Sequence, residues 1–159
     1  MKNQTKFVWQ GRNDGDSPLH HRIFQRVEIA ENYENILPNN FVLHGFAVDE
    51  GVRRNKGRVG AAKAHNIIRK NMSNFPVVSP DFKLLDFGNI TCEDRNLENT
   101  QENLAEKVSK ILQKNGKSIV LGVETGVACE STGAVVSITN TLLFAKLVTG
   151  MKFIIARLV

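Results

Sequence analysis

The pattern of hydrophobic and polar residues along the chain predicts three buried strands separated by two helices. Residues 41–46 (FVLHGF), 83–87 (KLLDF) and 118–121 (SIVL) are short apolar runs with β-branched or aromatic side chains, as is typical of buried strands. Between them, apolar residues recur at helical spacing: Ala64, Ile67, Ile68 and Met72, then Leu104, Val108, Ile111 and Leu112. Strands joined through helices pair in parallel, so we expect an α/β fold whose parallel sheet has helices on both faces.

Turn and cap signals mark the ends of the two helices. The first is expected to begin at Ala61 and to end before Pro76, because proline interrupts a helix. In the second, Asn99 with Glu102 three residues later predicts a capping box, and Gly116 predicts the stop.

The connections at the carboxyl ends of the strands are where chemistry is expected, because ligands of parallel sheets bind there. They are residues 47–60, residues 88–97 and the loop after Leu121. Residues 47–60 are rich in glycine and charge, so we expect no regular element in them. Residues 88–97 are expected to form a polar loop.

Three regions are expected along the chain. Residues 1–40 show no sustained period and predict an irregular N-terminal arm. Residues 41–122 hold the predicted strands and helices. Residues 123–159 contain apolar runs without a clear cap, turn or alternation, which predicts some β or mixed structure in a divergent C-terminal tail.

Composition narrows the class of protein. With 159 residues, 42% of them hydrophobic and 23% charged, the chain has the composition of one soluble globular domain. No uninterrupted apolar stretch reaches about 18 residues, so we expect no membrane span. Cys92 and Cys129 form no C-x-x-C pair and no signal peptide opens the chain, which predicts a reducing, cytoplasmic setting and no structural zinc site.

The densest chemical feature is a basic loop, residues 53–58 (RRNKGR), with four cations in six residues. The candidate substrate-binding residues are Arg53, Arg54, Asn55, Lys56 and Arg58. The loop lies between a predicted strand and a predicted helix, whose first N–H groups are free, so the position suits an anionic ligand. A solvated basic loop explains the same charges equally well.

Nucleotide and nucleic-acid binding have weaker support. The loop lacks the order of a G-x-x-x-x-G-K-[ST] phosphate loop and of a G-x-G-x-x-G motif. A formal net charge of +5 permits an anionic partner such as RNA, but only 7% of the residues are aromatic. None of them interleaves with the basic run, so there is no platform on which bases would stack.

Several segments together carry a family signature. They are W-x-G-R-x-D at 9–14, the histidine pair at 20–21, GFAVDEGVRRNKGRVGAAKA at 45–64, I-I-R at 67–69, LLDFGNITCED at 84–94 and SIVLG at 118–122. With these motifs, residues 7–122 resemble the N-terminal part of the formimidoylglutamases, which belong to the ureohydrolase group with arginase and agmatinase. The NKGR-x-GA run after a strand is the most specific element.

The resemblance implies an arginase-like three-layer α/β/α domain around the parallel sheet. Family members hydrolyse N-formimidoyl-L-glutamate to L-glutamate and formamide, a step of histidine degradation in which two Mn²⁺ ions hold the attacking hydroxide. The resemblance therefore implies a small-molecule substrate and manganese. It also implies that residues 53–58 lie at the mouth of the active site, where their cations meet the carboxylates of the substrate.

The metal-ligand motifs of the family are missing from this chain. In the family, the strand that ends in LG runs into G-G-G-H-E, whose histidine is the first ligand, whereas VET follows Gly122 here. The other ligands come from a D-x-H-x-D motif and a later D-x-D motif, but the last aspartate is Asp94 and the last histidine is His65. We therefore predict no metal ligands, no catalytic residues, a truncated domain and an inactive chain.

We hypothesise that residues 123–159 are a frameshifted or degenerate tail. Two other functions stay open from the sequence. One is a non-enzymatic module that binds an anion or RNA through residues 53–58, and the other is an inert fragment.

Overall fold

The computed structural model describes residues 6–15, 17–77, 79 and 81–122, together with the backbone of two strands at 142–146 and 153–157. The strands are β1 (Val27–Ile29), β2 (Phe41–Ala47), β3 (Leu84–Thr91), β4 (Lys117–Leu121), β5 (Leu142–Lys146) and β6 (Phe153–Arg157). The α-helices are α1 (Glu50–Arg54), α2 (Ala64–Met72) and α3 (Leu97–Gln113). Short 3-10 helices lie at Pro18–His20, Ile23–Gln25, Tyr33–Asn35 and Ala61–Lys63.

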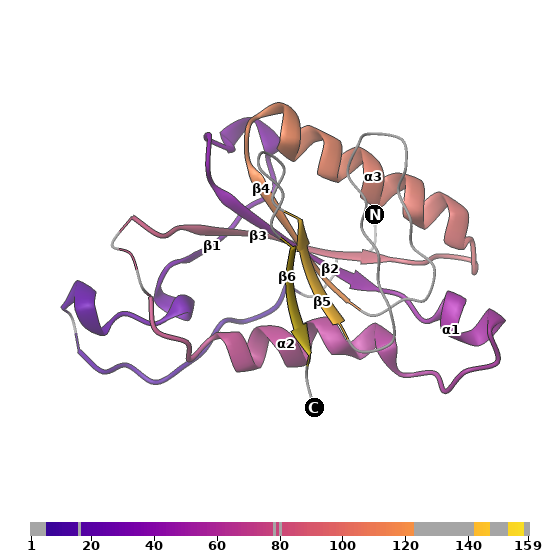
Figure 1. The fold of residues 1–159 in the computed structure, drawn as a ribbon, viewed down its shortest axis with the longest axis horizontal. Helices are drawn as coiled ribbons and strands as arrows, with labels where there is room; N and C mark the ends of the chain where they lie inside the picture. The colour runs from indigo at the N-terminus through magenta and orange to yellow at the C-terminus, as the bar shows by residue number, and fades with distance from the viewer. Residues whose placement is uncertain are drawn as a thin grey trace.

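The strands form one sheet in the order β1-β3-β2-β4-β5-β6. β1, β3, β2 and β4 are parallel, whereas β5 pairs antiparallel with β4, and β6 antiparallel with β5. The chain moves from β2 to β3 through α2, then crosses back over β2 to β4 through α3. Right-handed crossovers in opposite directions place α2 and α3 on opposite faces, as Figure 1 shows. The predicted α/β class is confirmed for this parallel part of the sheet.

Alternation along β2 builds both halves of the core. Val42 packs in a cluster with Ile111 of α3, and its neighbour Leu43 packs on the opposite face with Ile68 and Met72 of α2. Both strand residues are fully buried. Because successive side chains of a strand point to opposite faces, one continuous apolar run serves two helices.

Three local expectations were wrong. Residues 47–60 do contain a regular element, the single-turn helix α1. β3 extends to Thr91, so the first four residues of the loop expected at 88–97 belong to the strand. Asn96, not Asn99, caps α3, because its side chain accepts a hydrogen bond from the backbone N–H of Asn99.

The N-terminal region contains one strand that its sequence pattern did not reveal. β1 pairs with β3 through Val27, Glu28 and Ile29, opposite Leu84, Leu85 and Asp86. The expected β structure near the C-terminus agrees with β5 and β6. The division of the chain at residues 40 and 122 stays a prediction, and the origin of residues 123–159 lies outside the described structure.

A buried ion pair joins α2 to β3. Arg69 and Asp86 are 0% and 1% exposed, and the guanidinium donates from Nε and Nη2 to the two carboxylate oxygens at 2.9 and 2.8 Å. Arg69 also donates to the side-chain oxygen of Asn89 at 2.8 Å and to the carbonyl of Gly88 at 3.1 Å. Asp86 in turn accepts from the backbone N–H of Gly88 at 2.9 Å. Each charge therefore has several partners, as burial of an ion pair requires.

The N-terminal arm and β2 complete the surroundings of this pair. The indole N–H of Trp9 donates to Asp86 at 2.8 Å, across 77 residues of sequence. On β2, a Cβ at Gly45 would lie 2.3 Å from the Asn89 side-chain oxygen and 2.7 Å from Nη1 of Arg69. Only glycine therefore leaves room for the guanidinium against the sheet.

The ion pair also explains why the buried face of α2 differs from the predicted one. The fully buried residues of α2 are His65 and Arg69, while Ile67 is 60% exposed. Ile68 and Met72 pack into the core as expected. The apolar pattern assigns arginine to the exposed side of a helix. The predicted buried face of α2 therefore included Ile67 and left out Arg69.

Replacing Arg69 with methionine should lower the free energy of unfolding by about 3–5 kcal/mol, because it leaves the Asp86 carboxylate buried without its counterion. The double variant R69M/D86N should recover part of that loss, since the unpaired charge is gone and the amide oxygen still accepts from Trp9. Lys110→Met, which breaks an exposed helical pair with Glu106, is the matched control with an effect under about 1 kcal/mol. Denaturant unfolding measures all three, and an R69M loss no larger than that of K110M would contradict the account.

A buried histidine on the α3 face of β2 pairs with a half-buried tyrosine. His44 is 1% exposed, and its Nε2 lies 2.6 Å from the hydroxyl of Tyr33, within hydrogen-bonding distance. Burial, reinforced by the charge of Lys107, lowers the pKa of His44 to about 3. Burial also raises the pKa of Tyr33. Both rings are therefore neutral in the folded protein near neutral pH.

Folding stability should consequently fall as the pH drops below 6.5. In that range the unfolded chain binds a proton at His44 and the folded chain does not until the pH approaches 3. The loss at pH 5 is about 2 kcal/mol relative to pH 7, from about 1.4 kcal/mol per pH unit. His44→Gln, which stays neutral, should remove this part of the slope in urea unfolding at the two pH values. Equal slopes for the two proteins would show that His44 titrates normally.

In the described part of the chain, none of the helices has the length and apolarity that crossing a bilayer requires.

Candidate functional site

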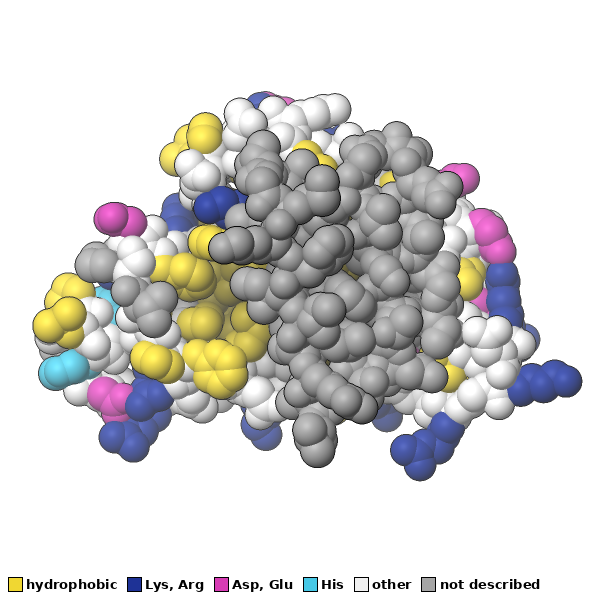
Figure 2. Space-filling model, viewed as in Figure 1, with side chains coloured by type: hydrophobic (Ala, Val, Ile, Leu, Met, Phe, Trp, Pro, Cys, Tyr) yellow, Lys and Arg dark blue, Asp and Glu magenta, His cyan; other side chains and the backbone are white. Residues whose placement is uncertain are grey.

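The candidate site lies at the carboxyl edge of the parallel strands, where β2 leads into α1. Val48 and Asp49 link the two elements, and the basic loop continues from α1 to the 3-10 turn before α2. In Figure 1, α1 lies at the same end of the sheet as the start of α3. In Figure 2, Lys and Arg side chains project from this end of the molecule, with carboxylates beside some of them.

One buried carboxylate, that of Glu50, pairs with both arginines of α1. Glu50 is 7% exposed and accepts from Arg53 Nε at 2.9 Å and Nη2 at 2.5 Å. It also accepts from Arg54 Nε at 3.0 Å. The spacings are i,i+3 and i,i+4, which bring side chains together on one helix face. Hydrogen bonds from Arg53 hold the pKa of Glu50 below its ordinary value, so it is ionised.

Arg54 also ties α1 to the start of α3. Its guanidinium is ion-paired with Glu98, with Nη2 at 3.1 Å from Oε2, and donates to the backbone carbonyl of Arg95 at 3.3 Å. The hydrogen bonds from Arg54 lower the pKa of Glu98 to about 2. Asp94 and Arg95 both have positive φ, 50° and 58°, in the turn after β3. Arg54 thus connects the loops that follow β2 and β3.

Asp49 closes the base of the basic loop. Its Oδ1 accepts from the backbone N–H of Gly60 at 3.1 Å and of Ala62 at 2.7 Å. Gly60 has φ +149°, a conformation that glycine adopts without strain. The loop therefore leaves and returns to nearly the same point.

The structure separates the five predicted substrate-binding residues into two groups. Arg53 and Arg54 belong to the ion pairs of α1, and Asn55 ends that helix. Lys56, with φ +56°, reverses the chain, and Lys56 and Arg58 are exposed at the tip. Among the described residues, neither of these two cations has a carboxylate within ion-pair distance. A role of the five residues in substrate binding stays a prediction.

The carboxylates at this edge do not fit the manganese pair that the resemblance implies. Asp49 accepts from two backbone amides and Glu50 from two guanidiniums, so both are already committed. Within residues 6–15, 17–77, 79 and 81–122, no three His, Cys, Asp or Glu side chains gather as a metal site. Mn²⁺ needs such oxygen and imidazole donors. No catalytic step through a metal follows from these residues.

Sequence reasoning missed the residues that shape the loop, Asp49, Glu50 and Glu98. The spacing of Glu50 to the two arginines was readable as a helical pairing pattern. The contacts of Asp49 with Gly60 and Ala62, and of Arg54 with Glu98, depend on the folded chain and have no local signal.

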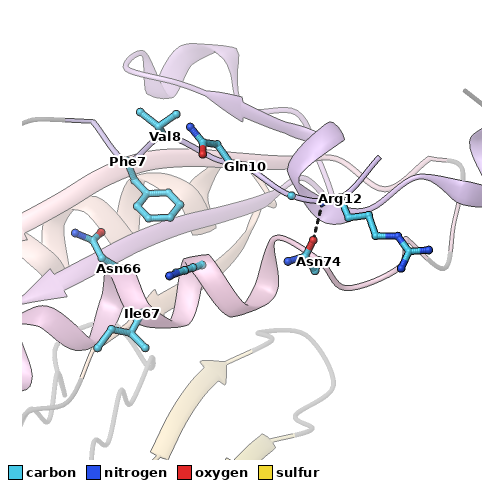
Figure 3. Close-up of a pocket in the computed structure, with 9 residues that line it drawn as sticks. Phe7, Val8, Gln10, Arg12, Asn66, Ile67 and Asn74 are labelled. Atoms are coloured by element: carbon cyan, nitrogen blue, oxygen red, sulfur yellow. Dashed lines mark hydrogen bonds between the residues drawn. The ribbon is translucent and has the colours of Figure 1, made fainter. Parts of the chain in front are cut away.

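A separate open groove of about 690 Å³ lies between the N-terminal arm and α2. Figure 3 shows Phe7, Val8 and Gln10 of the arm opposite Asn66 and Ile67 of the helix. At one end of the groove, the backbone N–H of Arg12 donates a hydrogen bond of 2.8 Å to the side-chain oxygen of Asn74 and so links the arm to the residue that follows α2 by two positions. None of the described residues that line the groove belongs to α1.

Comparison with known proteins identifies the class of protein that this fold represents. The model of the arginase family matches residues 39–143. The chain belongs to the arginase family.

Individual relatives narrow the similarity. The formimidoylglutamase of Clostridium tetani is 43% identical over 121 residues, 72% of this chain and 36% of the relative. That of Paraburkholderia xenovorans is 38% identical over 116 residues, with the same coverage. A crystal structure of formiminoglutamase from Trypanosoma cruzi with Mn²⁺ matches 62% of this chain and 35% of that chain, with a TM-score of 0.50 and 30% identity. The chain spans about a third of the length of the curated relatives it matches.

Replacing Asp49 with alanine should lower the free energy of unfolding by about 1–2 kcal/mol, because two backbone amides lose a charged acceptor. The amides of Gly60 and Ala62 should then exchange their hydrogens faster than in the parent protein. Asp49→Asn keeps an acceptor oxygen and should lose less, and Glu102→Ala on the exposed side of α3 is the neutral control. Unchanged exchange at both amides in D49A would refute this role of Asp49.

Proposed function

We propose that this chain is the N-terminal part of a formimidoylglutamase-type domain and that, by itself, it does not catalyse. The reaction of that enzyme class is the hydrolysis of N-formimidoyl-L-glutamate to L-glutamate and formamide. We further propose that its substrate is a small molecule, that manganese is the metal of the complete site, and that the setting is cytoplasmic.

One observation carries the assignment. Trp9, Arg69 and Asp86 come from three separate motifs of the formimidoylglutamase signature, and both Trp9 and Arg69 donate hydrogen bonds to Asp86. Chance similarity in short motifs does not account for hydrogen bonds that join the three motifs at one carboxylate. This joining of the arm, α2 and β3 supports the assignment of the three motifs to one domain of the formimidoylglutamase type.

The proposed lack of catalysis is supported by the distribution of aspartate and histidine along the sequence. The last aspartate is Asp94 and the last histidine is His65, so no D-x-H-x-D or later D-x-D motif is present. The carboxylates of Asp49 and Glu50 at the carboxyl edge are engaged with the loop itself. Without metal-ligating side chains the chain cannot bind the metal ions that would activate a water molecule.

A role of residues 53–58 as a non-enzymatic module that binds RNA or another anion has less support. Two of the four cations, Arg53 and Arg54, are neutralised by Glu50 and Glu98, which reduces the charge available to a polyanion. An inert fragment remains the alternative if neither activity nor ligand binding is found.

A chimera tests the family assignment. Residues 1–122 of this chain are joined to the segment of the Clostridium tetani relative that follows its matched part, and formamide release is measured with Mn²⁺. We expect metal-dependent release from the chimera and none from the 159-residue chain, with the complete relative as positive control. The same chimera carrying R69M should lose folded protein, because the buried ion pair is broken.

Two outcomes would contradict the proposal. A folded, manganese-loaded chimera without activity would reject the assignment of residues 1–122 to this enzyme class. Manganese-dependent turnover by the 159-residue chain, or tight binding of two Mn²⁺ to it in calorimetry, would reject the proposed lack of catalysis.

A further inference from the structure

The four cations of the basic loop fall into a neutralised pair and an uncompensated pair. Arg53 and Arg54 share the buried carboxylate of Glu50, and Arg54 also meets Glu98, so two positive charges face two negative ones. At the tip, Lys56 and Arg58 add two positive charges that no carboxylate of the described residues offsets. The uncompensated positive charge of the loop is thus concentrated at its tip, residues 56–58.

The tip is held in place rather than free. The N–H of Gly57 donates to the carbonyl of Val52 at 2.8 Å, and the N–H of Lys56 to that of Arg53 at 3.0 Å. A Cβ at Gly57 would lie only 3.0 Å from a side-chain carbon of Val52, so a residue larger than glycine would push the tip outward. With Asp49 closing the base, both ends and the turn of the loop are fixed. Binding a ligand there costs little ordering of the backbone.

We propose that Lys56 and Arg58 are the residues that bind the carboxylates of a glutamate-type dicarboxylate, and that Arg53 and Arg54 are positioning residues that act through Glu50 and Glu98. This inference rests on the proposed function, which supplies the dicarboxylate as the substrate class. Of the five candidate substrate-binding residues, only Lys56 and Arg58 would then contact the ligand, and the others would hold the loop in place.

The chemistry of the two side chains suits this ligand. A guanidinium binds a carboxylate through two parallel N–H groups, while an ammonium acts as a compact point charge. The two uncompensated cations provide one counterion for each carboxylate of a dicarboxylate. Arg53 and Arg54 lack this freedom, because leaving Glu50 would strand a 7% exposed carboxylate without counterions.

Backbone amide shifts of the isotopically labelled 159-residue chain, titrated with L-glutamate at constant ionic strength, test the inference. We expect shifts confined to residues 56–60, with weaker shifts when acetate replaces glutamate. The double variant K56A/R58A should weaken glutamate binding by about fivefold or more, as expected for two exposed ion pairs. K83A/K114A, which removes two lysines paired with glutamates outside the basic loop, is the control with equal charge change and should leave binding unchanged.

Glu50→Gln separates a positioned site from simple charge attraction. The substitution raises the charge of the loop and releases two guanidiniums, so attraction by charge alone predicts tighter glutamate binding. A fixed two-cation site predicts weaker binding and loss of the preference for glutamate over acetate. Because Glu50 is buried and its loss can impair folding, Glu98→Gln provides a second, exposed variant that loosens only the Arg54 link.

The outcomes distinguish this inference from the proposed function. Glutamate shifts that persist in K56A/R58A, or glutamate binding that tightens in both E50Q and E98Q, would overturn the inference. So would the absence of any shift at 56–60, even if the chimera described above is active. Turnover by the 159-residue chain would overturn the proposed lack of catalysis, and glutamate binding that depends on Lys56 and Arg58 would still support the inference.

Discussion

The buried pair of Arg69 and Asp86 is the interaction on which the rest of the structure depends. It brings α2 against β3, requires glycine at position 45 of β2, and provides the acceptor for Trp9 of the N-terminal arm. Two charges inside a core are stable only when both are present and hydrogen-bonded. The pair therefore specifies a single arrangement of four segments that hydrophobic packing alone would hold less specifically.

The pattern of apolar residues correctly predicted the helices and strands whose buried side chains are mostly apolar. Val42 and Leu43 alternate across β2, and Leu104 and Val108 of α3 are buried as their spacing indicated. The pattern gave the wrong buried face for α2 because Arg69 occupies a core position. A charged residue in the core depends on a partner 17 positions away, and local periodicity contains no information on such a partner.

The sequence predicted where the candidate site lies but not which contacts hold its side chains. A basic loop after a buried strand was visible in the sequence, and the structure places it at the carboxyl edge of the parallel strands. Which of its cations are neutralised depends on Glu50, one turn of helix away, and on Glu98, 44 residues beyond Arg54. The first contact follows from helical spacing that was available in the sequence, whereas the second exists only because β2 and β3 are neighbours in the sheet.

The bond between Trp9 and Asp86 has a consequence for the order in which the chain folds. Arg69 and Asp86 belong to one strand-helix-strand unit, whereas Trp9 reaches that unit across 77 residues. Closing so long a loop costs more chain entropy than closing the unit itself, and the acceptor exists only once β3 is in place. The N-terminal arm is synthesised before its acceptor, so we expect a nascent chain to carry Trp9 without this hydrogen bond until β3 has paired with β2.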